Sequence, residues 1–563
     1  MARERKSLGE SLTDAGIITP EQLKQAQQEE KRMGIPLRKA LTKLGFIDEN
    51  DLVAFISEKL EVPRIELDNY MIDPKVAEVV PEALARKYEL IPISKIDNRL
   101  TCAMVDPWNI FALDELRMKT NLIIEPAVAT ESEIKKALNQ CYGAKGSMED
   151  LIKSIDEEKL GVKAGREMDL KKLKGVVEEP IVIKLVNLIV MKAVKEGASD
   201  IHIEPEEDTL KTRLRVDGML HEIESPPKHL QSAIISRIKI MANLDIAERR
   251  VPQDGRFTTK MEGKQIDVRV SCIPTIYGEN VVMRLLDAST AMLGLEQLGF
   301  SKQMLEKYHK LIIRPHGIIL VTGPTGSGKT TTLYASLDKI NSAEKNIITI
   351  EDPVEYKLAG IRQTQVDEKV GLTFAGGLRS ILRQDPNIIM VGEVRDLETA
   401  EITIQAALTG HLVFSTLHTN DAPGAITRLI DMGVEPFLVS SSVIGVLAQR
   451  LVRRICDACK KEHTPTKEEL KDIGLLEDTK MKFYKGEGCP KCMSSGYKGR
   501  VSIYELMVPD EHIHNAIVSK APAEEIRKLA RASGMITLME DGIEKVKAGL
   551  TTVEEVLRVT REE

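Results

Sequence analysis

The chain has 563 residues, a hydrophobic content of 42% and a net charge of −7. Its length exceeds what a single hydrophobic core supports, so we expect several domains, and its negative charge gives no general attraction to nucleic acid or to an anionic membrane. No apolar run approaches the roughly 18–20 residues of a membrane-spanning helix, and no apolar segment follows the basic N-terminus as it does in a secretory signal. These features predict a cytoplasmic protein without a transmembrane segment.

The first sixty residues contain a helical repeat. "LGESLTDAGIITPEQL" begins at Leu8 and "LRKALTKLGFIDENDL" begins at Leu37, and the second segment repeats the leucine and glycine positions of the first. Each segment predicts a helix, a glycine turn and a second helix that opens with a capping residue, Thr19 or Asp48. A mixed segment follows, so we assign residues 1–142 to an N-terminal domain with this helical repeat at its front.

A charged segment without aromatic residues, 143–178, predicts a linker. After it, apolar and polar residues alternate in "TLKTRLRVDG" and "KQIDVRVSCIP", which places Arg213, Arg215 and Arg269 on the face opposite the apolar residues. The pattern predicts a small α+β domain, 179–290, with one polar sheet face.

From residue 291 onward, short apolar runs alternate with helical stretches, as in "GIILVT", "NIITI", "NIIMVG" and "HLVFST". This pattern predicts an α/β domain, 291–563, whose mostly parallel sheet is covered by helices. Amphipathic helices are expected at its C-terminal end.

The first of these runs is followed by G-x-x-x-x-G-K-T and then by a helical stretch, which is the context that a phosphate-binding loop requires. The glycines let backbone N–H groups face the phosphates, Lys329 reaches the β- and γ-phosphates, and the Thr330 hydroxyl ligates Mg²⁺. A chance glycine-rich turn is the alternative. The predicted ATP-binding residues are Gly323, Pro324, Thr325, Gly326, Ser327, Gly328, Lys329, Thr330 and Thr331.

Acidic residues and histidines flank the other apolar runs of this domain. Glu393 ends the buried run in "PNIIMVGEVRD", where a carboxylate is costly unless a neighbouring group needs its charge. We expect it to orient or deprotonate the attacking water, and an ion pair with Arg395 or another arginine is the alternative. We predict one polar cleft at these strand ends. Its other predicted members are Glu351 and Asp352 as Mg²⁺ ligands, Glu355 and His418 as catalytic residues, and His411, which flanks the other end of the run that His418 follows.

Four of the seven cysteines form two C-x-x-C pairs, Cys456 with Cys459 and Cys489 with Cys492. Two such pairs can complete a closed tetrahedral Zn²⁺ site. The long loop between them is no obstacle, because its closure costs only ~0.4 kcal/mol more than a loop of ordinary length, whereas structural zinc contributes on the order of 10–16 kcal/mol. We predict a structural zinc subdomain, 451–500, with reduced buried cysteines and redox chemistry as the alternatives.

Four ordered segments, "GPTGSGKT", "ITIEDPVE", "DPNIIMVGEVRD" and "TGHLVFSTLHTN", resemble the Walker A, aspartate box, Walker B and histidine box of secretion ATPases. Nearly the whole chain resembles the type II secretion and type IV pilus assembly ATPases. This resemblance implies a RecA-like P-loop NTPase domain preceded by a PAS-like α+β domain. It also implies a homohexamer, peripheral at the inner membrane, that moves an inner-membrane platform protein and so feeds pilin subunits into a fibre.

The resemblance also extends to arginines and cysteines. "DVRVSCIPTIYGENVVMRLLD" resembles the segment that supplies the family's nucleotide-sensing arginines and matches them to Arg269 and Arg284, for which weak surface ion pairs are the alternative. The tetracysteine subdomain is typical of assembly motors rather than of retraction motors. Further arginine candidates for nucleotide contact are Arg379, Arg383, Arg428 and Arg500.

The N-terminal repeat resembles a cyclic-di-GMP-binding module in which two R-L-G units are each closed by a glutamine. Here Ser7 and Pro36 replace the leading arginines. Glu30 and Lys59 replace the closing glutamines, and Arg38 replaces the second early glycine. Cyclic-di-GMP binding and the docking of a cytoplasmic scaffold protein of the pilus machine therefore both stay open.

Together these patterns predict a cytoplasmic hexameric ATPase that drives type IV pilus assembly. The nearest alternative is a type II secretion ATPase, which shares every motif. A nucleic-acid motor would need a basic groove with stacking aromatic residues, but aromatic residues make up only 4% of the chain. Glu393 and Lys329 argue against a scaffold that binds ATP without hydrolysing it.

Overall fold

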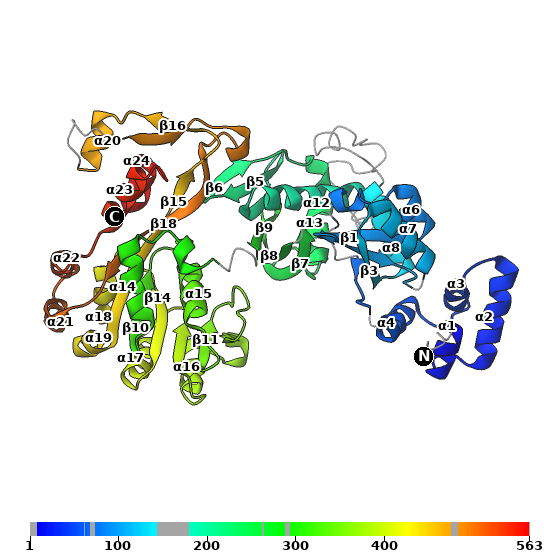
Figure 1. The fold of residues 1–563 in the computed structure, drawn as a ribbon, viewed down its shortest axis with the longest axis horizontal. Coiled ribbons are helices and arrows are strands. Elements are labelled where there is room, and N and C mark those ends of the chain that lie inside the picture. The colour runs from blue at the N-terminus through cyan, green and yellow to red at the C-terminus, as the bar shows by residue number, and fades with distance from the viewer. Residues whose placement is uncertain are drawn as a thin grey trace. The chain divides into compact units, whose positions relative to one another are not determined.

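The computed structural model describes residues 8–60, 62–67, 72, 74–107, 109–142, 180–261, 264–287, 293–474 and 482–561. The predicted linker, 143–178, lies outside these described residues. The chain forms two compact units, Met1–Ala288 and Ser289–Glu563 (Figure 1). None of the helices in the described ranges combines the length and the apolar composition needed to cross a membrane.

Four helices form the repeat at the front of the first unit: α1 (Leu8–Asp14), α2 (Pro20–Met33), α3 (Leu37–Lys43) and α4 (Glu49–Leu60). Thr19 opens α2 with a capping box, because its hydroxyl accepts from the Gln22 N–H and its own N–H donates to the Gln22 side chain. Leu12 and Leu41 occupy equivalent positions of the repeat and are fully buried in one apolar cluster. These leucine faces hold the helices together.

In the described residues that follow, a three-stranded sheet and four helices form the rest of the N-terminal region. β2 (Arg99–Met104) pairs antiparallel with β1 (Leu90–Ile96) and parallel with β3 (Ile123–Val128). The segment that shows no regular period in the sequence is therefore a small α/β layer. Its helices are α5 (Pro74–Ala77), α6 (Glu82–Lys87), α7 (Ile110–Thr120) and α8 (Glu131–Tyr142).

The C-terminal part of the first unit is an antiparallel six-stranded sheet with the order β6-β5-β4-β9-β8-β7. Helices α12 (Pro180–Lys195) and α13 (Gln231–Met241) bury apolar side chains against it in one cluster. The predicted alternation is confirmed, since Val268 and Val270 are buried in this cluster and Arg269 between them lies on the opposite face. The strands are β4 (Ala198–Pro205), β5 (Leu210–Val216), β6 (Met219–Glu222), β7 (Gln253–Met261), β8 (Lys264–Thr275) and β9 (Gly278–Asp287).

The second unit contains a seven-stranded sheet with the order β12-β11-β13-β14-β10-β15-β18. Every neighbouring pair is parallel except β15 with β18, so the prediction of a mostly parallel sheet is confirmed. The strands are β10 (Gly317–Thr322), β11 (Ile347–Glu351), β12 (Arg362–Gln365), β13 (Ile388–Val391), β14 (Leu412–Leu417), β15 (Val443–Ile455) and β18 (Tyr497–Met507).

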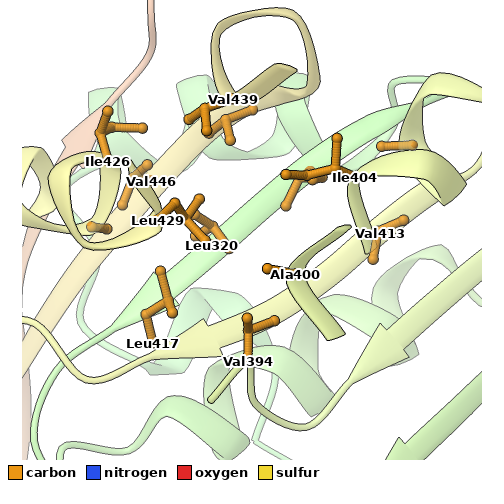
Figure 2. Close-up of a cluster of buried hydrophobic side chains, with 14 of the residues drawn as sticks. Leu320, Val394, Ala400, Ile404, Val413, Leu417, Ile426, Leu429, Val439 and Val446 are labelled. Atoms are coloured by element: carbon orange, nitrogen blue, oxygen red, sulfur yellow. The ribbon is translucent and has the colours of Figure 1, made fainter. Parts of the chain in front are cut away.

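Helices cover both faces of this sheet. Successive residues of a strand point to opposite faces, so the strands contribute side chains to two separate apolar clusters. Leu320 packs in the apolar cluster of one face, where Figure 2 shows it near Leu429 and Val446. Val321 packs in a second cluster together with Leu333 of the helix that follows the phosphate loop. The helices are α14 (Lys302–Ile312), α15 (Lys329–Ile340), α16 (Phe374–Ile381), α17 (Leu397–Leu408), α18 (Ala422–Asp431), α19 (Pro436–Ser442), α21 (Glu511–Val518), α22 (Ala523–Ala532), α23 (Leu538–Lys547) and α24 (Val553–Thr560).

A small excursion separates β15 from β18. It contains β16 (Lys460–His463), α20 (Lys467–Asp472) and β17 (Phe483–Gly486), and the two strands pair antiparallel. Cys459 directly precedes β16 and Cys489 follows β17. The strand pairing therefore brings the two C-x-x-C segments together.

Candidate nucleotide site

The G-x-x-x-x-G-K-T segment connects β10 to α15 at the carboxyl end of the parallel strands. The shape of the loop requires its first glycine: Gly323 has φ 151°, and a Cβ there would lie 2.6 Å from both the Gln449 carbonyl oxygen and the Ser327 hydroxyl. Gly328 has φ 89° and directly precedes Lys329, the first residue of α15. The loop therefore presents a helix N-terminus, where backbone N–H groups favour an anion.

Lys329 turns back onto the loop in this structure. Its Nζ donates to the carbonyl oxygens of Gly323 at 2.7 Å and Pro324 at 3.1 Å. Burial lowers the pKa of Lys329 to about 8, an effect that the Glu393 carboxylate opposes and the Arg450 guanidinium reinforces. The ammonium therefore stays mostly charged at neutral pH, and a phosphate that enters the loop competes with two carbonyl groups for it.

Glu393 follows β13 and is the centre of a polar cluster. Its Oε1 lies 2.5 Å from Arg395 Nη2, and its Oε2 lies 3.4 Å from His418 Nε2. Glu393 also lies close enough to Lys329 to act on its pKa. Since β13, β14 and β10 are adjacent in the sheet, their carboxyl ends meet here. The structure thus brings Lys329, Glu393 and His418 together, and the ion pair with Arg395 is present as well.

The acidic residue that ends β11, the strand of the aspartate-box segment, points into the protein. Glu351 is buried, and its carboxylate accepts hydrogen bonds from the Tyr334 hydroxyl and from the Thr349 hydroxyl at 2.6 Å. The Gln363 amide donates to the same carboxylate at 3.2 Å. These bonds give Glu351 a structural role, and the geometry offers no support for its assignment as a Mg²⁺ ligand.

The next acidic residues lie nearer the surface. Asp352 is exposed, and the pKa of Arg395 is raised chiefly by Glu393 and further by Asp352. Asp352 therefore lies beside the Glu393 cluster and is the better Mg²⁺ candidate of this segment. Glu355 is half-buried, and its backbone N–H donates to the Tyr334 hydroxyl at 3.3 Å.

Hydrogen bonds that sequence reasoning missed tie the loop to neighbouring strands. The Thr322 hydroxyl at the end of β10 accepts from the Thr419 N–H at 2.9 Å, although the two residues are 97 positions apart. On the other side of β10, the Gln449 side chain of β15 bonds Ser327 and Thr332. No local pattern marks these residues, and only the strand order, with β14 and β15 flanking β10, could have indicated them.

His411 lies at the amino end of β14, whereas His418 follows its carboxyl end. The His411 Nδ1 contacts the Ala406 carbonyl oxygen at 2.8 Å. The expectation that His411 belongs to the polar cleft is therefore wrong. The two histidines flank β14, so they lie at opposite edges of the sheet.

Arginines of the six-stranded sheet in the first unit form a row. Arg284 on β9 is the cross-strand neighbour of Arg269 on β8 and of Asp200 on β4. Arg256 lies next to Arg269, and Arg215 lies opposite Asp200, so the row crosses five strands. The Arg284 Nε is 3.1 Å from Asp200 Oδ1, while 59% of its side chain stays exposed. On the face away from α12 and α13, the row offers guanidinium groups that suit phosphate oxygens.

The other arginine candidates belong to separate elements of the second unit. Arg379 contacts Glu398 at 2.6 Å, and the Arg383 guanidinium donates to the Arg379 carbonyl oxygen at 2.9 Å. Arg428 lies on α18, and Arg500 lies on β18. The contacts of Arg379 and Arg383 are with other protein groups. They favour none of the four residues over the others as a nucleotide ligand.

The Sγ atoms of Cys456, Cys459, Cys489 and Cys492 all lie within 4.8 Å of one another. The Cys456–Cys489 and Cys459–Cys492 separations are 3.9 Å, well beyond the ~2.05 Å of a disulfide bond. A tetrahedral metal with bonds of about 2.3 Å holds its sulfur ligands about 3.8 Å apart, so this cluster can hold one metal ion. Burial raises the pKa of Cys492, but N–H groups of Cys489 and Gly496, together with the neighbouring Cys489 and Cys459 thiols, outweigh burial and lower this pKa to about 7.

Known proteins match the chain along most of its length. It matches the family described as "Type II/IV secretion system protein" over residues 176–558 and the "MshEN domain" over residues 60–148. The "Type IV pilus assembly ATPase PilB" of Myxococcus xanthus is 47% identical over 555 residues, which cover 98% of each chain. The "Type II secretion system protein E" of Xanthomonas campestris is 44% identical over 562 residues, again 98% of each chain. The solved Legionella pneumophila ATPase DotB, at 21% identity and a TM-score of 0.50 over 67% of this chain and 95% of its own, shares the fold.

Proposed function

The chain belongs to the type II/IV secretion system protein family and is an ATPase, and on this premise we propose that it is the hexameric motor that drives type IV pilus assembly. The observation that carries the proposal is the near-full-length match to a pilus assembly ATPase, which includes the N-terminal region as well as the catalytic domain. In this role the protein is cytoplasmic, lies peripherally at the inner membrane and acts on an inner-membrane platform protein.

Nucleotide binding begins at the loop Gly323–Thr330. Lys329 exchanges its contacts with the loop carbonyl groups for the β- and γ-phosphates of ATP. Mg²⁺, when bound, neutralises phosphate charge, and Thr330 and Asp352 are the residues that would hold it. The adjacent Thr331 is the third residue of α15 and completes the binding segment.

Hydrolysis is assigned to the cluster around Glu393. Its carboxylate orients or deprotonates the attacking water, and His418, which follows the neighbouring strand β14, holds the second carboxylate oxygen in place. Arg395 is 66% exposed, so its guanidinium can turn from Glu393 to a phosphate oxygen and leave the carboxylate to the water. Glu355 is a further catalytic candidate.

Arg269 and Arg284 are proposed to act on nucleotide bound by a neighbouring subunit of the hexamer. An arginine at the γ-phosphate contributes roughly 10³–10⁵ in rate in other NTPases. The arginine row of the six-stranded sheet supports this assignment, because it presents several guanidinium groups side by side.

A mixing experiment tests both the ring and the shared site. Arg284→Ala and Lys329→Ala should each be inactive alone, and Arg99→Ala, an exposed arginine of the N-terminal layer, is the matched control. In an equal mixture, about a quarter of the interfaces would pair an intact loop with an intact arginine, and ATPase activity should reappear. A mixture that stays inactive although mixed rings form would refute the shared site.

We propose Zn²⁺ as the metal of the cysteine cluster, in a structural role. Four sulfur ligands at tetrahedral separations support Zn²⁺, because structural zinc sites are closed and thiolate-rich. The cluster closes the excursion between β15 and β18. Zn²⁺ would therefore stabilise that excursion rather than take part in hydrolysis.

We propose that the N-terminal domain docks a cytoplasmic scaffold protein rather than cyclic-di-GMP. Arg38, which replaces a glycine of the cyclic-di-GMP module, contacts Glu89 at 2.9 Å and Asp106 at 3.5 Å. Lys39 contacts Glu89 at 2.7 Å and Glu131 at 2.8 Å. These ion pairs tie Arg38 and Lys39, in the repeat segment that begins at Leu37, to other residues of the N-terminal domain. Calorimetry of the full chain tests this assignment, and heat from cyclic-di-GMP at tens of micromolar would overturn it.

A type II secretion ATPase is the second candidate function, because a relative of that name matches the chain nearly as well. Deletion of the gene in its own organism separates the two. We expect loss of surface pili with unchanged release of secreted enzymes, and rescue by the wild-type gene but not by Lys329→Ala. Lost enzyme release with intact pili would assign the protein to type II secretion instead.

A further inference from the structure

Gln449 lies on β15 at the level of the phosphate loop. The last residue pair between β10 and β15 joins Thr322 to Ala448, so Gln449 is the next residue along β15 and lies beside Gly323. Its side chain is fully buried. A buried amide needs hydrogen-bond partners, and those of Gln449 belong to the phosphate loop and to the helix that follows it.

The Gln449 amide joins the loop to the first turn of α15. Its Nε2 donates to the Ser327 carbonyl oxygen at 2.7 Å, and its Oε1 accepts from the Thr332 hydroxyl at 2.8 Å. The amide can have only this orientation, because a carbonyl oxygen accepts and cannot donate. Glutamine supplies the donor and the acceptor that this position requires.

The bond to Ser327 also fixes the direction of a neighbouring N–H group. In a planar trans peptide the C=O and N–H bonds point in opposite directions. The Gly328 N–H therefore points away from Gln449, because the Ser327 carbonyl of the same peptide points towards it. That N–H is one of the loop groups to which a phosphate would bind.

We propose that Gln449 is a positioning residue for ATP hydrolysis: it holds the Ser327–Gly328 peptide in the orientation that receives the phosphates. The inference rests on the ATPase activity and not on the assignment to pilus assembly. Without the amide this peptide is able to flip, and nucleotide binding must then first reverse the flip.

Gln449→Met tests the proposal, because methionine keeps the length of the side chain and forms neither bond. We expect roughly 10–100-fold weaker binding of a fluorescent ADP and a similar loss of kcat/KM for ATP. KM should rise more than kcat falls, because the anchored peptide contacts the phosphates in the ground state and in the transition state alike. Gln405→Met, on the exposed surface of α17, is the matched control and should leave both quantities unchanged.

The double variant Gln449→Met/Thr332→Val separates positioning from a loss of stability. It removes the hydroxyl that has lost its amide acceptor in Gln449→Met, so the Tm should recover in part. The Ser327 carbonyl is still without its anchor, so ADP binding should stay weak. Recovery of ADP affinity together with the Tm, or wild-type affinity in Gln449→Met itself, would overturn the proposal. Wild-type protein that hydrolyses no ATP in the same assay would instead refute the ATPase assignment.

Discussion

The pKa of Lys329 sets a quantitative expectation for the pH dependence of ATP use. Burial lowers this pKa from 10.5 to about 8 in the free enzyme, and the Glu393 carboxylate keeps it from falling further. Because the charged ammonium attracts the phosphates, kcat/KM should decline once the pH exceeds that pKa. At pH 9 roughly one site in ten is still charged, so kcat/KM should be about tenfold below its value at pH 7.

Phosphate release at sub-saturating ATP, measured from about pH 7 to pH 9.5, gives this profile directly. Glu393→Gln provides an internal check, read as the affinity for fluorescent ADP. Loss of the carboxylate lowers the pKa of Lys329 further, so the decline in ADP affinity should begin at a lower pH than in the wild type. A kcat/KM that stays flat to pH 9.5, or the same midpoint for ADP binding in both proteins, would refute this reasoning.

The proposed catalytic carboxylate of Glu393, the cysteine cluster and a buried glutamate each give a separate test. Glu393→Gln should bind ATP with near wild-type affinity and release no phosphate above background, and normal turnover would remove its catalytic role. Cys456→Ser should lose the bound metal in elemental analysis and several degrees of Tm, whereas Cys141→Ser, outside the cluster, should keep its metal. Burial raises the pKa of Glu505 from 4.5 to about 7. Between these values the folded protein holds a proton that the unfolded chain has lost, so the free energy of unfolding should fall by about 3 kcal/mol as the pH rises. Urea titrations of Glu505→Gln should lack this slope, and an unchanged slope would contradict the assignment.

Local patterns predicted the parts of the site that one segment supplies by itself. Lys329 and Thr330 stand in a motif whose preceding strand and following helix are both visible in the sequence. The spacing within the C-x-x-C pairs likewise led to the cluster, although the pairing of β16 with β17 is what closes it. Period-two alternation predicted the face on which Arg269 lies. It could not give the register that makes Arg284 its direct neighbour.

Contacts between distant segments were beyond sequence reasoning. Gln449 reaches Ser327 across 122 positions, and only the order of strands makes them adjacent. Glu351 and Asp352 are indistinguishable as acidic residues at a strand end. The Tyr334 hydroxyl, which comes from a helix on another segment, is what holds Glu351 in the interior.

The long strand β15, with 13 residues, passes the nucleotide loop at Gln449 and ends directly before Cys456 of the cysteine cluster. At about 3.3 Å per residue, Gln449 and Ile455 at the end of β15 lie roughly 20 Å apart along the strand, and Cys456 follows directly. Pairing with β18 from Val446 to Ile455 and the contact of Arg453 with Glu555 stiffen its outer half. We expect β15 to transmit a displacement of the phosphate loop to the excursion that carries the cysteine cluster. If the rate of amide hydrogen exchange around Cys456 is the same with and without ADP, β15 does not couple the two sites.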